Sequence, residues 1–156
     1  MAATARTTAA VNKLVITHVG ALRHKYRSTG LAQVRAALRD LVAADAALGI
    51  RTRLVAVDDG RTARAVRAPD VKDPADPAAT KRFVDAACAR WEPEYVVLLG
   101  SPDVVPLQPL TNPLWTGDAR RGDADESVPS DLPYACDAPF SLDPGRFRGA
   151  TRVARG

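Results

Sequence analysis

The sequence predicts an α/β fold, a three-layer sandwich around a mainly parallel sheet. Three short runs rich in Val, Leu and Ile, at 13–19, 52–57 and 95–99, have the length and composition of buried strands. One helical pattern separates the first run from the second, and another separates the second from the third. Strands that alternate with helices form βαβ units, whose crossovers place parallel strands in one sheet with helices over its faces.

The first half of the chain predicts a strand, a helix and a second strand. Residues 13–19 (KLVITHV) are rich in β-branched types, and Gly20 is expected to release the chain into a loop. Apolar residues recur at three- and four-residue steps over 31–48, which predicts an amphipathic helix with Gly49 as its stop. Residues 52–57 (TRLVAV) follow as the second strand.

The middle of the chain predicts a surface segment, a helix and a third strand. Residues 60–76 are charged and contain two prolines, so we expect a surface excursion there. Asp76 followed by Pro77 predicts a helix start, with an N-cap acceptor and a proline in the first turn. Pro93 closes that helix, and 95–99 is expected to be a strand buried on both faces.

The last third lacks periodicity. Residues 101–149 hold eight of the twelve prolines and predict a long irregular loop, and TRVARG at the end of the chain resembles the opening of another strand. We therefore expect a disordered tail over 1–12 and one α/β domain over 13–156, with an incomplete sheet.

Composition excludes several classes of protein. No run approaches the roughly 18 apolar residues of a membrane span, and the start lacks the apolar stretch of a secretory signal, so we expect a cytoplasmic protein without a membrane partner. The two cysteines are too few for a disulfide scaffold and lack zinc-site spacing. The acidic stretch 116–127 lacks the ligand spacing of a calcium loop, and no glycine-rich phosphate motif follows a strand. We expect no metal and no cofactor.

Charge is divided unevenly along the chain. Residues 1–67 hold 12 Lys and Arg against 4 Asp and Glu, whereas residues 68–156 hold 10 against 14. A basic half could bind nucleic acid, but no recognised motif and almost no aromatic residues accompany its arginines. We expect no nucleic-acid partner.

The segments after the third strand hold the candidate pocket residues. Ligands of open parallel sheets bind beyond the carboxyl ends of the strands, and Asp103, Asp131, Tyr134 and Asp137 all lie there. An unpaired carboxylate in that place could receive a Lys or Arg side chain. The alternative is that each Asp caps backbone amides of its turn, and that Tyr134 closes the core.

Nucleophilic chemistry has little support in the residues. Cys88 lies on the apolar face of the second helix and is expected in the core. Cys136 lies in a loop, and His18, at the end of the first strand, could reach the same sheet edge. Two residues without a motif do not define a dyad, so we assign no catalytic residue. His24, between basic residues, is expected in a solvated loop, and no serine has a GxSxG elbow.

Five stretches in sequence order resemble the gingipain-like cysteine peptidases, a caspase-fold family. They are THVGAL, LAQVRAALRDLVAADAALG, YVVLLGSPDVVP, VPSDLPYACDAP and RFRGATRVARG, which together span about residues 13–155. The most specific pieces are VVLLGSPDVVP and SDLPYACDAP. The resemblance implies a caspase-like sandwich, in which a His–Cys dyad cleaves peptide bonds.

The resemblance also implies where the dyad would lie. In the family the His follows the fourth strand, commonly beside a glycine, and the Cys ends the next strand. The fourth strand would begin near Thr151, so both positions would fall past Gly156. Neither His18 nor Cys136 occupies a motif position.

Three functions follow as hypotheses. The first is a truncated or split gingipain-like peptidase domain that lacks the dyad, is inactive alone, and cleaves after basic residues when a carboxyl-terminal half completes it. The second is a non-catalytic module that binds a protein or peptide partner with the sheet edge and the long loop. The third, a flavodoxin-like small-molecule binder, has only the βαβ order in its favour.

Overall fold

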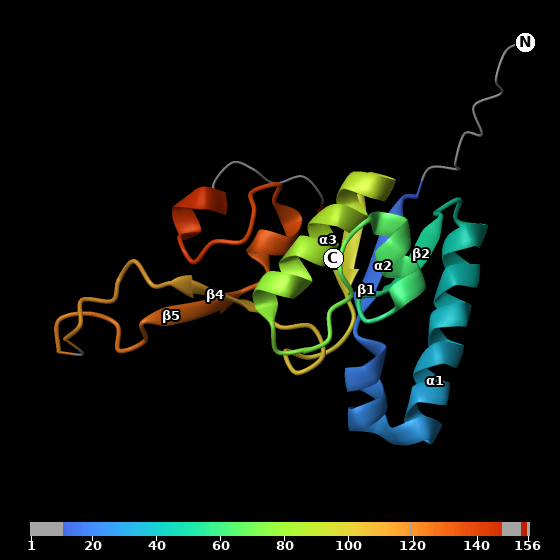
Figure 1. The fold of residues 1–156 in the computed structure, drawn as a ribbon, viewed down its shortest axis with the longest axis horizontal. Helices are drawn as coiled ribbons and strands as arrows, with labels where there is room; N and C mark the ends of the chain where they lie inside the picture. The colour runs from blue at the N-terminus through green and yellow to red at the C-terminus, as the bar shows by residue number, and fades with distance from the viewer. Residues whose placement is uncertain (1–10, 119, 148–153, 156) are drawn as a thin grey trace, which may run out of the picture.

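The α/β sandwich is confirmed in the computed structural model, which describes residues 11–118, 120–147 and the backbone of 154–155 (Figure 1). Four strands form one sheet in the order β2-β1-β3-β6, and every neighbouring pair is parallel. They are β1 (Lys13–Thr17), β2 (Thr52–Ala56), β3 (Tyr95–Leu98) and β6 (Ala154–Arg155). The strand predicted near the end of the chain is therefore present at β6, whereas its expected start at Thr151 lies outside the described residues.

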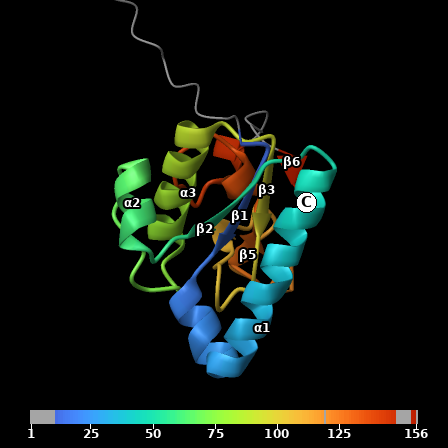
Figure 2. The same ribbon diagram turned by 90° about the vertical axis from the view of Figure 1, so that its right-hand side faces the viewer.

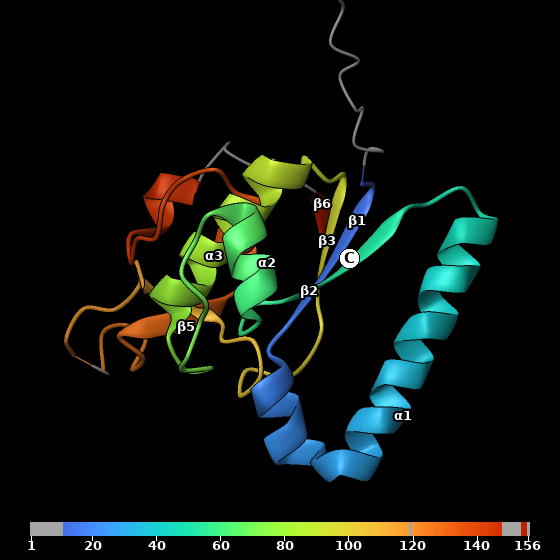
Figure 3. The same ribbon diagram turned by 45° about the vertical axis from the view of Figure 1, so that its right-hand side comes forward.

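Three helices cover the sheet, one on one face and two on the other (Figures 2 and 3). They are α1 (Val19–Ala47), α2 (Gly60–Val66) and α3 (Pro77–Trp91). As predicted, α3 begins at Pro77, where the Asp76 side chain accepts a hydrogen bond from the amide of Ala79. The main core lies between the sheet and α3, where Phe83 and Val84 are fully buried.

The sheet face toward α1 is less well covered than the face toward α3. Val15 in β1 is buried, but its neighbours on the same face, Leu54 in β2 and Tyr95 in β3, are each 43% exposed. The expectation that 95–99 is buried on both faces is therefore wrong: Tyr95 is exposed, Val96 is buried, and residues 97–99 are only partly buried. The physical reason is that α1 covers this face only in part and leaves its own Leu41 and Leu48 exposed as well.

Helix α1 begins earlier than predicted, because polar side chains stabilise its first turn. Gly20 does not start a loop: its amide donates to the Asp58 carboxylate over 2.7 Å, and the amide of Val19 donates to the same carboxylate over 2.9 Å. His18 is the N-cap. His24 is exposed as expected, but it lies in this helix and not in a loop.

A kink divides α1 into two arms. Arg27 has φ 57° and ψ −173°, a conformation that favours glycine. The predicted helix over 31–48 corresponds to the second arm, which ends at Ala47. Gly49 follows with φ +78°, as expected for a helix stop.

The surface segment predicted over 60–76 contains the short helix α2. Asp59 caps it by accepting hydrogen bonds from the amide and hydroxyl of Thr62. Ala63 and Val66 are buried in the main core. Their burial stabilises a helix in a segment whose charged composition predicted a loop.

The irregular loop predicted over 101–149 also contains regular structure. An antiparallel hairpin is formed by β4 (Gln108–Thr111) and β5 (Ser127–Ser130), and it extends away from the main sheet (Figure 1). Two 3-10 turns follow, η1 (Leu132–Ala135) and η2 (Pro144–Phe147). Here proline is accommodated within a two-stranded sheet and at the start of short helical turns, so proline content misled the prediction.

Most of the predicted tail over 1–12 lies outside the described residues. Asn12 is an exception, because it is hydrogen-bonded on both sides. Its carbonyl accepts from the amides of Glu94 and Tyr95, and its side chain accepts from the amide of Arg51. The ordered domain therefore begins before β1.

A buried carboxylate joins the second arm of α1 to the sheet. Asp45 is 5% exposed and accepts two hydrogen bonds from the Lys13 ammonium, at 2.8 and 2.9 Å, and one from the Thr52 hydroxyl. The hydrogen bonds from Lys13 and then from Thr52 hold the pKa of Asp45 below its ordinary value.

Replacing Asp45 with asparagine is expected to reduce the loss of stability in acid. A carboxyl with a lowered folded pKa takes up a proton more readily in the unfolded chain, so its contribution is complete above a pH of about 4 and is lost as the pH falls through the folded pKa. Urea unfolding at several pH values between about 6 and 3 measures this slope. Asp40→Asn, the same change at an exposed position of α1, is the control. Identical slopes for Asp45→Asn and the unmodified protein would contradict the assignment.

Candidate functional site

Three strands of the parallel sheet end at the same edge and deliver polar residues there. β1 leads to His18, β2 leads to Asp58, and β3 leads through Gly100 to Ser101 and Asp103. Because the strands are parallel, their carboxyl ends meet at this edge, the usual place for a ligand site in such folds.

His18 and Asp58 together cap α1. The Nδ1 atom of His18 accepts a hydrogen bond from the amide of Ala21 over 3.1 Å and lies 3.4 Å from an Asp58 carboxylate oxygen. The His18 side chain is 6% exposed, and its Nε2 atom has no hydrogen-bond partner among the described residues. This end of the sheet therefore contains a buried polar atom, Nε2 of His18, whose hydrogen-bonding capacity is not met by the described residues.

Asp103 is already paired with a basic side chain of the same chain. Both its carboxylate oxygens accept hydrogen bonds from the Lys25 ammonium over 2.8 Å. The Ser101 hydroxyl accepts a hydrogen bond from Lys25 and donates one to Asp103. The hydrogen bond between the two charged groups raises the pKa of Lys25 and lowers that of Asp103. An incoming Lys or Arg side chain would have to compete with Lys25 for this carboxylate.

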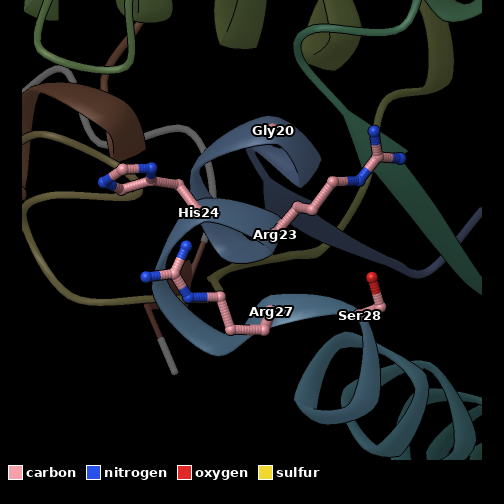
Figure 4. A pocket seen from close by; sticks show the side chains of 5 residues that line it. All are labelled: Gly20, Arg23, His24, Arg27 and Ser28. Carbon is pink, nitrogen blue, oxygen red and sulfur yellow. The ribbon is translucent and has the colours of Figure 1, made fainter.

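A cavity of about 620 Å³ opens at this edge. We call it the edge cavity; its lining includes His18, Gly20, His24, Lys25, Lys72 and Asp103. A second hollow, of about 400 Å³, shares Gly20 and His24 with it and adds Arg23, Arg27 and Ser28. In Figure 4, His24 and Arg27 point to one side of the first arm of α1, whereas Arg23 points away from them.

The other three predicted pocket residues lie around η1, at a different part of the fold. Tyr134 is 3% exposed, and its hydroxyl donates to the carbonyl of Pro106 over 2.6 Å, so it closes the core. Burial raises the pKa of Tyr134 well above its ordinary value. Asp131 and Asp137 are exposed on either side of η1. Of the four candidates, Asp103 is the one that lines the edge cavity.

The two cysteines are both buried. Cys88 is 4% exposed in the main core, which confirms its predicted place. Cys136 is 2% exposed and packs in a second apolar cluster with Leu110 and Phe147, where its Sγ atom donates to the carbonyl of Phe147 over 3.5 Å. His18, by contrast, caps α1, so the structure gives these side chains separate surroundings.

Lys25, Asp58 and Lys72 contribute to this edge but were not among the predicted residues. Asp58 could have been found, because it directly follows the second strand. The expectation of a ligand site beyond the carboxyl ends of the strands applies to it as much as to Asp103. Lys25 could not, because its helical turn was predicted to be a loop. Lys72 lies in the connection between α2 and α3, and nothing in the sequence around it indicates that it lines this cavity.

No family model, curated protein or solved structure matches this chain. The class of protein is therefore defined by the fold and the edge alone: a parallel α/β sandwich with a polar cavity at the carboxyl ends of its strands. Within the described residues, no helix has the length and apolar character to span a membrane. The same part of the chain contains no group of three or more His, Cys, Asp or Glu side chains arranged to hold a metal ion.

Proposed function

We propose that this chain forms the amino-terminal half of a gingipain-like cysteine peptidase domain and is inactive alone. The observation that carries the proposal is the position of β6, which pairs in parallel with β3 as the fourth strand of the order β2-β1-β3-β6. The family resemblance expects the fourth strand there, with the catalytic His after it and the Cys at the end of the next strand.

The described side chains are in keeping with a dyad supplied from elsewhere. The Nδ1 atom of His18 is engaged in capping α1, and the thiols of Cys88 and Cys136 are both buried in apolar clusters. A cysteine nucleophile needs an accessible thiolate beside a base. In the proposed domain, a strand added on the side of β6 away from β3 would bring the dyad to the same carboxyl edge that holds His18 and Asp103.

The isolated chain is expected to hydrolyse no fluorogenic Arg or Lys peptide above the blank. Turnover that iodoacetamide abolishes would contradict the proposal, because it would require an active cysteine within residues 1–156. Cys136→Ala and Cys88→Ala, assayed beside the unmodified chain, would identify the thiol responsible.

A non-catalytic protein-binding module is the second candidate, and one observation favours it. The hairpin of β4 and β5 extends from the main sheet and exposes apolar side chains: Leu114 is 69% exposed, Trp115 41% and Val128 44% (Figure 1). Exposed aromatic and aliphatic groups are common anchors of protein interfaces. This candidate, unlike the first, requires no dyad in a completing segment.

A further inference from the structure

The tautomer of His18 follows from its hydrogen bond. Because Nδ1 accepts from the amide of Ala21, it carries a lone pair, and the neutral imidazole then carries its proton on Nε2. That N–H group is buried and has no acceptor among the described residues. A buried donor without an acceptor costs free energy, and an oxygen acceptor supplied by a ligand would recover it.

The surroundings of His18 favour an acceptor with negative charge. Two ammonium groups, Lys25 and Lys72, line the same cavity as His18. Lys72 is 82% exposed and donates one hydrogen bond, to Asp70, among the contacts of the described residues. Each ammonium carries three N–H donors and a flexible stem, so both can reorient toward an anion.

The acidic groups at this edge are already engaged. Asp58 accepts from two backbone amides on the Nδ1 side of His18, and Asp103 and Asp70 are paired with Lys25 and Lys72. The adjoining hollow adds Arg23 and Arg27, and no Asp or Glu lines that hollow. The balance of charge that a ligand would meet is therefore positive.

We propose that the edge cavity binds the oxyanion group of a small ligand, a phosphate or a carboxylate, through the Nε2–H of His18 and the ammonium of Lys72. The volume of about 620 Å³ is within the range of small-molecule sites, so the oxyanion would be one end of a larger ligand. This proposal does not depend on peptidase activity, because it uses residues of the described chain alone.

The test is a titration of the full chain, labelled with ¹⁵N, with inorganic phosphate and separately with acetate. Sodium chloride keeps the ionic strength constant, and the pH is about 8, where an ordinary histidine is neutral. Two-bond ¹H–¹⁵N spectra report the tautomer of His18 and the resonance of its Nε2. We expect the Nε2–H tautomer in the free protein and a saturable shift of that resonance with at least one of the two anions.

Two variants assign the effect to the proposed groups. His18→Asn retains an N-cap acceptor, because asparagine is among the preferred cap residues, but it removes the Nε2 donor. It is expected to weaken binding about tenfold, as measured from the amide shifts of Ala21 and Lys25. Lys72→Met changes an exposed side chain and is expected to weaken binding about threefold. Arg39→Gln, an exposed position on the second arm of α1, removes the same charge and should leave the affinity unchanged.

The outcomes are decisive in both directions. Saturation with phosphate alone assigns a phosphate group, saturation with acetate alone assigns a carboxylate, and saturation with both assigns an oxyanion site of either kind. The proposal is overturned if neither anion gives a saturable shift, or if His18→Asn binds as well as the unmodified chain while its amide spectrum stays dispersed. It is also overturned if Arg39→Gln weakens binding as much as Lys72→Met, because that result indicates a general effect of charge.

Discussion

Replacing Gly100 with alanine is expected to destabilise the protein by about 2–5 kcal/mol, from backbone strain and overpacking together. Gly100 has φ +131°, which side chains rarely permit. An added Cβ would lie 2.5 Å from the Cβ of Val104 and 2.6 Å from its Cγ1. Val104 is 1% exposed and packs in the main core, so it has no room to move away. Urea unfolding measures the change in the free energy of unfolding.

Two other glycines separate the causes of that loss. Gly117→Ala meets a positive φ of +75° but no atom within 4 Å, so it should lose about 1 kcal/mol through strain alone. Gly60→Ala, in the first turn of α2, has only a distant Arg64 atom at 3.9 Å and should be neutral or slightly stabilising. Equal stability of Gly100→Ala and Gly60→Ala would show that the turn after β3 is not fixed by Val104. That turn positions Ser101 and Asp103, so their hydrogen bonds with Lys25 should also weaken in Gly100→Ala.

Replacing Lys81 with methionine is expected to destabilise the protein by about 2 kcal/mol, because breaking a buried charged contact leaves its partners uncompensated. Lys81 in α3 is fully buried, and its ammonium donates to Asp85 and, over 3.0 Å, to the carbonyl of Cys136. Asp85 is 32% exposed and so recovers part of its hydration, which places the loss below that of a fully buried pair. The contact joins α3 to η1, so its removal should loosen η1 in particular.

Thiol labelling gives the local readout for this change. Cys136 is buried beside η1, and its reaction with a thiol reagent should accelerate in Lys81→Met more than that of Cys88 in the main core. Arg82→Gln removes an adjacent but exposed charge and should leave both labelling rates and the stability unchanged. Unchanged labelling of Cys136 in Lys81→Met would contradict the role of this contact.

The parallel core could be predicted from sequence because its signals are local. β-branched runs at 13–19 and 52–57, and a proline after an Asp cap at Pro77, each specify one element without information from elsewhere. The start of α1 could not be predicted, because it depends on Asp58, which comes from a strand about 40 residues later. The hairpin of β4 and β5 was missed because proline normally opposes strand pairing, and here two prolines face each other in the register.

The sequence indicates a candidate site after the third strand, but it does not indicate the partners of the side chains there. Ligands of parallel sheets bind beyond the carboxyl ends of the strands, which directs attention to the residues after the third strand, and one of the four named there, Asp103, lines the edge cavity. Sequence could not show that Asp103 is already paired with Lys25, because the two residues are far apart in the chain. They meet only in the fold, where the first arm of α1 lies beside the turn after β3. Nor could it show that Tyr134 is part of the core, since its hydroxyl is satisfied by the carbonyl of Pro106. Side-chain pairing of this kind is a tertiary property.

The most direct test of the proposed peptidase half is the activity of a chain extended by the coding sequence downstream of Gly156. We predict that the extension encodes a His–Gly after β6 and a Cys at the end of the next strand. The extended chain should then hydrolyse fluorogenic Arg or Lys peptides in a reaction that iodoacetamide and a Cys→Ala change at that position both abolish. An extended chain without these residues, or one that contains them and folds but shows no such hydrolysis, would contradict the proposal.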